Sequence, residues 1–243
     1  MRLIESDGTG GFRLTKDLLG DDEIPPYGIL SHTWQNGEEV TFNDIEGGTG
    51  NGKSGYKKIE FCMRQAKRDD LHYIWVDTCC INKSDNVELQ HALNSMFRWY
   101  ENAVKCYVFL SDVSTNQGVD NESDEIPWGP AFRGSRWFTR CWTLQELLAP
   151  MTVEFYSKEG NLLGTRQSLE IAIHEITGIQ VEALQRIPLR HFDVDDRFSW
   201  AENRRATREE DKAYALLGIF GIFMVPNYGE GEQNAVARLR RKI

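Results

Sequence analysis

The sequence predicts an α/β protein with a mostly parallel sheet, helices on both faces, and a helical extension after the sheet. Three observations support this fold class. Short apolar runs alternate with amphipathic stretches at least three times, the runs show no apolar–polar alternation, and the chain becomes mostly helical in character after residue 160. Buried strands that alternate with helices are typical of a parallel sheet covered on both faces.

Four apolar runs are expected to form the parallel strands. The first covers residues 27–31 and follows a pair of prolines. "LHYIWVDT" and "VKCYVFLSD" supply the second and third strands, and "TVEFYS" supplies the fourth. Because these runs are apolar at successive positions, they are expected to be buried on both faces of the sheet.

Helices are expected between the strands and after them. "YKKIEFCMRQAKRDD" and "VELQHALNSMFRWYENA" place apolar residues at helical spacing. A third helix is expected over "SRWFTRCWTLQELLAP", and a later one is expected to begin with a capping box of Thr207 and Glu210. These patterns predict two parts, a core over residues 1–160 and a helical extension over residues 161–243 that packs on it and leads to a downstream domain.

Composition narrows the function classes. The 243 residues carry a net charge of −9, with 40% hydrophobic and 27% charged residues, which is typical of a soluble globular protein. An acidic chain without a basic face is an unlikely nucleic-acid binder. The longest apolar run, residues 213–226, is too short to span a membrane. Five cysteines form no C-x-x-C pair, which favours a reducing, cytoplasmic location.

The segment "GGTGNGKS" at residues 47–54 fits the P-loop pattern G-x-x-x-x-G-K-[ST]. A P-loop requires a buried strand that leads directly into the loop, followed by a helix N-terminus that holds the phosphates. The preceding "EEVTFNDIE" predicts at best a half-exposed edge strand, and its acids would repel a triphosphate. We therefore interpret the segment as a glycine-rich loop, with a P-loop NTPase as a minor alternative.

Polar and aromatic side chains follow three of the predicted strands. The first strand end supplies Ser31, His32 and Trp34, the second supplies Asp77, and the third supplies residues 111–112. The carboxyl ends of parallel strands are where ligands bind in such sheets, so these side chains predict a small-molecule cleft. Taken singly, each could instead cap a turn or a helix, because polar residues are common at strand ends.

A glutamate in the third predicted helix is a further candidate. Glu146 lies one turn after Trp142, so carboxylate and indole are neighbours beside the apolar stripe of the helix. A carboxylate held against apolar surface loses solvation and is available to stabilise a developing positive charge. From the pattern alone, a surface glutamate is the more common outcome.

Five segments in this order resemble the fungal heterokaryon-incompatibility (HET) domain: "YGILSHTW", "YIWVDTCCINK", "MFRWYENAVKCYVFLSD", "SRWFTRCWTLQELLAP" and "TREEDKAYALLGIFGIFMVPNYGEGEQNAVARLRRKI". The resemblance runs from about residue 26 to the end. It is strongest to the HET domains that precede NACHT and WD-repeat domains in proteins controlling cell death after hyphal fusion. It implies that this chain is the effector module of a longer protein with such domains downstream.

HET domains are similar in turn to Toll/interleukin receptor (TIR) domains, which share a flavodoxin-like sheet. Catalytic TIR domains cleave the nicotinamide–ribose bond of NAD⁺, using a glutamate in a W-x-x-x-E pattern after the third strand. Trp142 and Glu146 supply that pattern here. The resemblance implies that Glu146 is catalytic, that NAD⁺ is a substrate rather than a cofactor, that no metal takes part, and that self-association completes the site. The residues expected to bind the substrate are Ser31, His32, Trp34, Asp77 and Trp142.

The alternative function is a non-catalytic module that signals by homotypic assembly alone.

Overall fold

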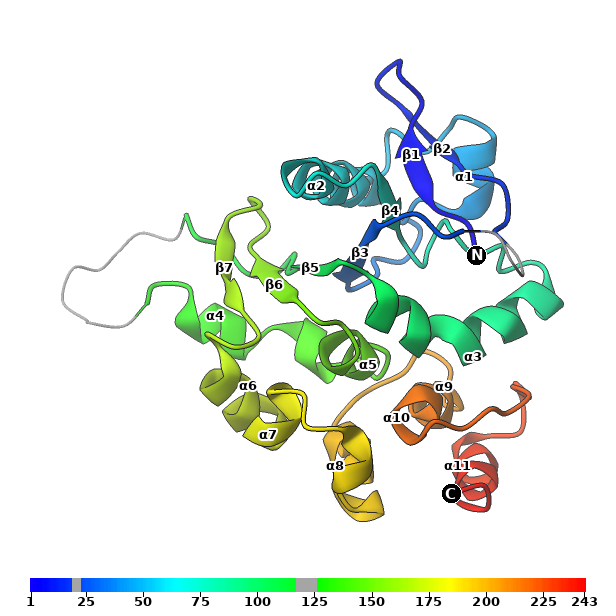
Figure 1. Ribbon diagram of the computed structural model, residues 1–243, viewed down its shortest axis with the longest axis vertical. Coiled ribbons are helices and arrows are strands. Elements are labelled where there is room, and N and C mark those ends of the chain that lie inside the picture. The colour runs from blue at the N-terminus through cyan, green and yellow to red at the C-terminus, as the bar shows by residue number, and fades with distance from the viewer. Residues whose placement is uncertain (19–22, 117–125) are drawn as a thin grey trace.

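A seven-stranded sheet forms the centre of the protein (Figure 1). The computed structural model describes residues 1–18, 23–116 and 126–243. The strands are β1 (Ile4–Ser6), β2 (Phe12–Leu14), β3 (Tyr27–His32), β4 (Tyr73–Trp75), β5 (Lys105–Phe109), β6 (Val153–Tyr156) and β7 (Leu162–Thr165). Their order across the sheet is β2-β1-β4-β3-β5-β6-β7.

The four central strands β4, β3, β5 and β6 are parallel, whereas the strands towards the two edges, β2 and β1 on one side and β7 on the other, each pair antiparallel with their neighbours. In chain order the parallel strands run second, first, third, fourth across the sheet, the order of flavodoxin-type folds. The predicted α/β class with a mostly parallel sheet is therefore confirmed. The edge strands were not predicted, and β7 extends the sheet past residue 160, the expected end of the core.

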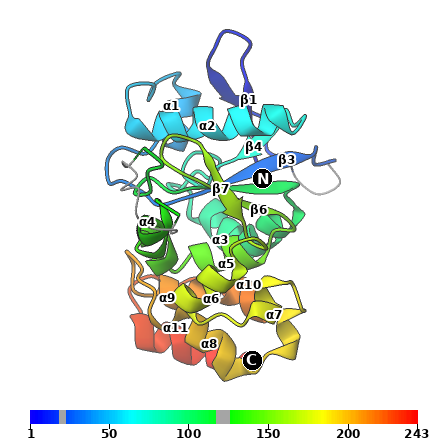
Figure 2. The same cartoon turned by 90° about the vertical axis from the view of Figure 1, so that its left-hand side faces the viewer.

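Helices cover both faces of the sheet. They are α1 (Phe42–Glu46), α2 (Ser54–Arg68), α3 (Asn86–Asn102), α4 (Gly129–Arg133), α5 (Thr143–Leu148), α6 (Glu170–Thr177), α7 (Val181–Leu184), α8 (Val194–Glu202), α9 (Asp211–Tyr214), α10 (Leu217–Phe220) and α11 (Glu232–Arg240). Short 3₁₀ helices span Arg136–Thr139 and Leu189–His191. Figures 1 and 2 show α2 on one face, α3 and α5 on the other, and the C-terminal helices as a further layer beyond α3 and α5.

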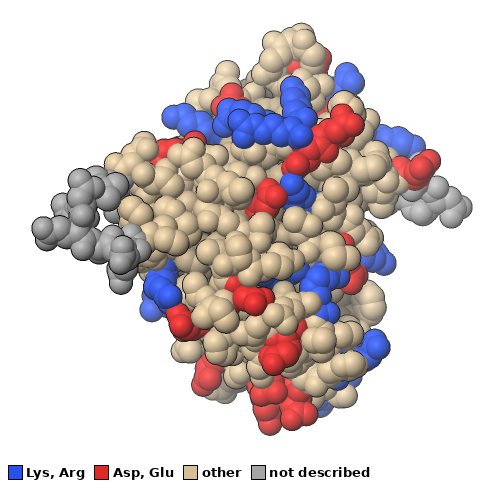
Figure 3. Space-filling model, turned by 60° about the vertical axis from the view of Figure 1, so that its left-hand side comes forward, with Lys and Arg blue, Asp and Glu red and all other residues tan. Residues whose placement is uncertain are grey.

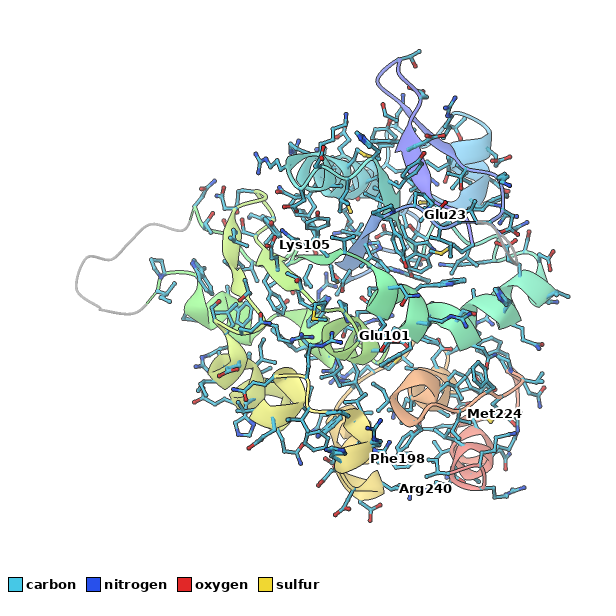
Figure 4. All side chains as sticks on the ribbon, viewed as in Figure 1. Glu23, Glu101, Lys105, Phe198, Met224 and Arg240 are labelled. Atoms are coloured by element: carbon cyan, nitrogen blue, oxygen red, sulfur yellow. The ribbon has the colours of Figure 1, made fainter. Side chains whose placement is uncertain are left out.

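Among the C-terminal helices, α10 packs directly on α3, and α6 packs on α4. A Cβ atom at Gly218 of α10 would lie 2.1 Å from the Cβ of Phe97 in α3, so glycine permits this close approach. Within the layer, the Arg240 guanidinium of α11 lies 4.0 Å from the centre of the Phe198 ring of α8, and Figure 4 shows the two side chains together. The extension therefore builds its own packing on top of one helical face.

The structure corrects the helix predicted over residues 135–150. Ser135 does begin a helical turn, since its hydroxyl accepts from the Trp137 amide, but this turn is a 3₁₀ helix that ends at Thr139. Helix α5 begins only at Thr143. The residues between pair with a distant segment: the Arg205 amide donates to the Thr139 carbonyl, and the Cys141 amide donates to the Arg205 carbonyl. These bonds replace the helical bonds that the sequence pattern predicted.

The capping box predicted for Thr207 and Glu210 is also wrong. The Glu210 carboxylate accepts from the backbone amides of Gly229 and Gly231, and helix α9 begins after it. Thr207 accepts instead from the Arg140 guanidinium, at 3.1 Å. Both side chains thus hold long-range contacts, which a pattern of neighbouring residues cannot indicate.

The loop at residues 47–54 lacks the context of a P-loop. The segment before it, expected at best as an edge strand, is the helix α1, closed at its start by a capping box of Thr41 and Asp44. The Lys53 ammonium lies 2.6 Å from the Asp44 carboxylate, and Glu38 accepts from the Ser54 amide at the start of α2. The chain's own carboxylates occupy the positions that a P-loop offers to phosphate.

The surface charges and the lengths of the helices bear on two expectations from the composition: that the chain has no basic face and that it does not span a membrane. On the face drawn in Figure 3, Lys and Arg side chains are interspersed with Asp and Glu, and acidic side chains gather at its lower end. In the described part of the chain, no helix combines the length and the apolar character needed to cross a bilayer.

We predict that Lys53→Ala has little effect beyond its own loop. The Lys53–Asp44 pair is partly exposed, so its loss should lower the free energy of unfolding by less than about 1 kcal/mol. Urea unfolding measures this change. Equilibrium dialysis with ATP should give the same result for both proteins, and ATP binding that Lys53→Ala abolishes would restore the NTPase alternative.

Candidate active site

A cavity of about 200 Å³ lies at the carboxyl ends of β3 and β4. His32 ends β3, and Asp77 follows β4. Leu89, Leu93 and Met96 of α3 form an apolar side, and α5 contributes Thr143 and Glu146. The remaining wall comes from the C-terminal part of the chain, and it comprises Thr207, Arg208, Asp211 and Tyr228. Segments that are distant in the sequence therefore enclose one site.

Glu146 lies deep in this cavity, with 6% of its surface exposed. The Ser31 hydroxyl donates to its carboxyl group at 2.5 Å, and the Trp137 indole N–H donates to the same hydroxyl at 2.8 Å. Because the indole N–H already points at the Ser31 oxygen, the serine proton is directed to Glu146. Ser31 itself is fully buried in β3, so it positions the carboxyl group from behind.

Two of the carboxyl groups that line the cavity, Glu146 and Asp77, differ in their proton affinity. Burial raises the pKa of Glu146 to about 8, and the negative charge of Asp77 adds to this effect, so Glu146 is mostly protonated at neutral pH. Burial would also raise the pKa of Asp77, but the charge of Lys83 and a hydrogen bond from His32 lower it. Environments that shift the pKa values of two neighbouring acids in opposite directions are typical of acid–base pairs in active sites.

A buried chain of polar groups supports Asp77. The His32 Nε2 atom lies 3.1 Å from the Asp77 carboxylate, and the His32 Nδ1 atom lies 3.3 Å from the Lys58 ammonium. Lys58 also donates to Glu39 at 2.5 Å. A lysine ammonium can only donate, so Nδ1 accepts from it, and Nε2 carries the proton that is donated to Asp77. The network fixes both the tautomer of His32 and the orientation of Asp77.

The C-terminal wall is anchored by a buried arginine. The Arg204 guanidinium donates to the Arg140 carbonyl and to the Thr143 hydroxyl, both at 2.9 Å, and to the Trp200 carbonyl at 3.0 Å. Beyond this anchor, Asp211 faces the cavity and accepts from the Tyr228 hydroxyl at 2.8 Å. Arg204 therefore joins the extension directly to the start of α5, three residues before Glu146.

Comparisons with known proteins identify the family of this chain. Residues 27–130 match the family model described as heterokaryon incompatibility protein (HET). The whole chain is 54% identical over 245 aligned residues to Vegetative incompatibility protein HET-E-1 of Podospora anserina. The chain carries a HET domain. It spans 18% of the length of that relative, and no solved structure gives a significant match.

The predicted site residues of the HET domain come together. Glu146, His32, Trp34, Asp77 and Trp142 all line the cavity. Ser31 lies directly behind Glu146, and Trp34 is 46% exposed at the mouth. The pair at residues 111–112 lies elsewhere, because Asp112 accepts from the Ser135 hydroxyl and the Arg136 amide at the start of the 3₁₀ helix. No group of three or more metal-type ligands occurs among the described residues.

Sequence reasoning missed the supporting network and the C-terminal wall. Lys58 and Glu39 occupy a helix and a loop that carry many other charged residues, so nothing in the pattern separates them. Asp211 and Arg208 belong to "TREEDKAY", where the charges were expected to form a helix start. The one signal in the sequence is the apolar run that follows, residues 213–217, which predicts that this segment is held against the core; the structure shows these residues buried.

We predict a pH-dependent stability that Glu146 controls. Its pKa is raised from 4.5 to about 8 by folding, so its protonated form stabilises the folded state below pH 4.5, and this contribution is lost as pH rises through 8. Glu146→Gln cannot titrate. The difference in unfolding free energy between wild type and Glu146→Gln should therefore shift in favour of the variant by a few kcal/mol across this window. Urea unfolding at several pH values measures the shift, and a constant difference would contradict it.

Proposed function

We propose that this HET domain hydrolyses NAD⁺ at the bond between nicotinamide and ribose, and that this activity drives an incompatibility cell-death response. The observation that carries the proposal is that the buried Glu146 and the ionised Asp77 line the same cavity, at its inner end, which we call the floor. Among the described residues, no Lys, Arg or His side chain forms an ion pair with Glu146. Acidic groups at the inner end of a cavity therefore favour a ligand with a positively charged end. The nicotinamide ring of NAD⁺ carries such a charge.

The reaction would break the bond between C1′ of the ribose and the ring nitrogen. The bonding electrons leave with nicotinamide, which becomes neutral, and positive charge passes to the ribose. Water then adds its oxygen to C1′ and releases a proton to solvent, giving ADP-ribose. Asp77 and Glu146 would stabilise the oxocarbenium-like centre electrostatically, and Glu146 would accept from the ribose hydroxyls.

The raised pKa of Glu146 fits a cationic substrate. A positive ring beside Glu146 acts opposite to Asp77 and favours the ionised carboxylate. The indoles of Trp34 and Trp142 line the cavity and offer faces on which the ring can stack. Binding of NAD⁺ and ionisation of Glu146 would then occur together.

An assembly surface supports the second candidate function, homotypic signalling without catalysis. Val87 at the start of α3 is 79% exposed and Phe223 after α10 is 69% exposed, and both line the same shallow groove. Large apolar side chains gathered on one surface are typical of an interaction site. Self-association through this groove would be the signal itself under this second function, and under the first function it would complete or activate the catalytic site.

The wider setting is also proposed. Because the chain spans a small part of its long relative, we infer that NACHT and WD-repeat domains lie downstream in the full protein and control assembly of the HET domain. The five buried, unpaired cysteines agree with the proposed cytoplasmic location.

We predict measurable NAD⁺ consumption by the purified HET domain, increased by forced clustering. If ionised Glu146 is required, kcat/KM should rise with pH about a midpoint near 8. Glu146→Gln should lower kcat by about 10²-fold or more. Ser31→Ala removes a hydrogen bond that lowers the pKa of Glu146, so its midpoint should move to higher pH. Nicotinamide release measured by chromatography checks each point.

Two outcomes separate the candidate functions. Lys53→Ala is the matched control, because its loop lies outside the cavity, and it should retain wild-type activity. If Glu146→Gln still kills cells while Phe223→Ser does not, the assembly function is favoured and hydrolysis is rejected. If killing follows NAD⁺ loss in both variants, hydrolysis is supported.

A further inference from the structure

Three cationic side chains surround the mouth of the cavity. Lys83 follows β4, Arg140 precedes α5, and Arg208 belongs to the C-terminal wall. Lys83 and Arg208 are exposed and Arg140 is half-buried, whereas Glu146 and Asp211 below them are buried. The cavity therefore has an acidic floor and a cationic rim, in a chain whose net charge is −9.

These cations are not used in ion pairs. Among the described residues, none of the three has a carboxylate oxygen within 4.0 Å. Asp77 and Asp211 share the cavity with them, at longer range. Other basic side chains, such as Lys105, do form direct pairs with carboxylates. Unpaired cations gathered at one opening indicate a missing anion.

Aromatic and hydroxyl contacts hold the three cations in place. The Lys83 ammonium lies 3.7 Å from the centre of the Trp34 ring, and the Arg208 guanidinium carbon lies 4.1 Å from the centre of the Tyr228 ring. Arg140 donates one bond to the Thr207 hydroxyl at 3.1 Å. Stacking on a ring face positions a cation without using its N–H donors, so these donors stay available.

We propose that Lys83, Arg140 and Arg208 bind the phosphate groups of the nucleotide whose nicotinamide ring lies over Glu146. This inference rests on the proposed function and names its substrate class, a 5′-phosphorylated nicotinamide nucleotide rather than the nucleoside. A guanidinium group binds two phosphate oxygens with its planar set of donors, and an ammonium group adds a point charge. In this orientation the cationic ring of the nucleotide meets the acidic floor, and its anionic phosphates meet the cationic rim.

The rim also gives the C-terminal extension a role in the site. Arg208 reaches the mouth because Arg204 anchors the segment before it, and Thr207 holds the side chain of Arg140. Two of the three cations thus depend on the docked extension. The extension is part of the substrate site, not only a layer that covers the core.

The first experiment compares NAD⁺ with nicotinamide riboside, which lacks phosphate. Arg208→Ala and Lys83→Ala should each lower kcat/KM for NAD⁺ by about 10-fold or more, the usual effect of losing one charge-assisted hydrogen bond. For the riboside, Arg208→Ala should stay within about 2-fold of wild type, whereas Lys83→Ala also removes the charge that lowers the pKa of Asp77 and is therefore compared for NAD⁺ only. Arg190→Ala removes an exposed positive charge outside the cavity and is the matched control, with no effect on either substrate. Equal losses for NAD⁺ and the riboside would overturn the proposal.

The second experiment does not depend on catalysis. Calorimetry should show that ADP-ribose binds the wild-type domain and the Arg190→Ala control alike, and binds Arg208→Ala about 10-fold or more weakly. Such binding without NAD⁺ hydrolysis would reject the proposed function and keep the phosphate site. Hydrolysis with unchanged ADP-ribose binding in Arg208→Ala would reject the phosphate site alone. Binding of ADP-ribose that does not compete with NAD⁺ would place a nucleotide elsewhere and also overturn the proposal.

Discussion

The backbone pairing between Arg205 and residues 139–141 determines the geometry of the site. It interrupts the helix that the sequence pattern predicts, so α5 starts at Thr143 and presents Glu146 to the carboxyl ends of β3 and β4. The Arg204 guanidinium lies beneath the same junction and is bonded to the Thr143 hydroxyl. One contact, between residues 204–205 and residues 139–143, therefore both docks the extension and places the carboxyl group of Glu146.

Two ionised acids buried on the floor of the cavity would destabilise the folded state, because each carboxylate loses its hydration and the two negative charges repel each other. The HET domain limits this cost by keeping Asp77 ionised and Glu146 protonated, and by satisfying each with a neutral or cationic donor. Ser31 serves Glu146, and His32 serves Asp77. A satisfied polar network of this kind has defined orientations, which is the condition for a preorganised site.

The sequence was most informative where local pattern and tertiary environment agree. The apolar runs of β3 and β5 and the spacing of α2 and α3 predicted a parallel sheet, and the carboxyl ends of β3 and β4 led to three residues of one cavity, His32, Trp34 and Asp77. It failed where a distant partner decides the outcome. Thr207 and Glu210 have the spacing of a capping box, yet each is held by residues far along the chain. Arg204 would be expected on the surface, since burial of an arginine depends on carbonyl groups that only the fold supplies.

On the proposed function, the charge order of the cavity explains how one site could bind substrate and release product. NAD⁺ brings a positive ring to the floor, where it favours ionisation of Glu146, and it brings phosphates to the rim. Once nicotinamide leaves, ADP-ribose has only its anionic part, so the floor loses its counter-charge and Glu146 returns to its protonated form. The same buried carboxyl group that lowers the barrier would therefore weaken the attraction for the product, while the rim alone continues to hold the phosphates.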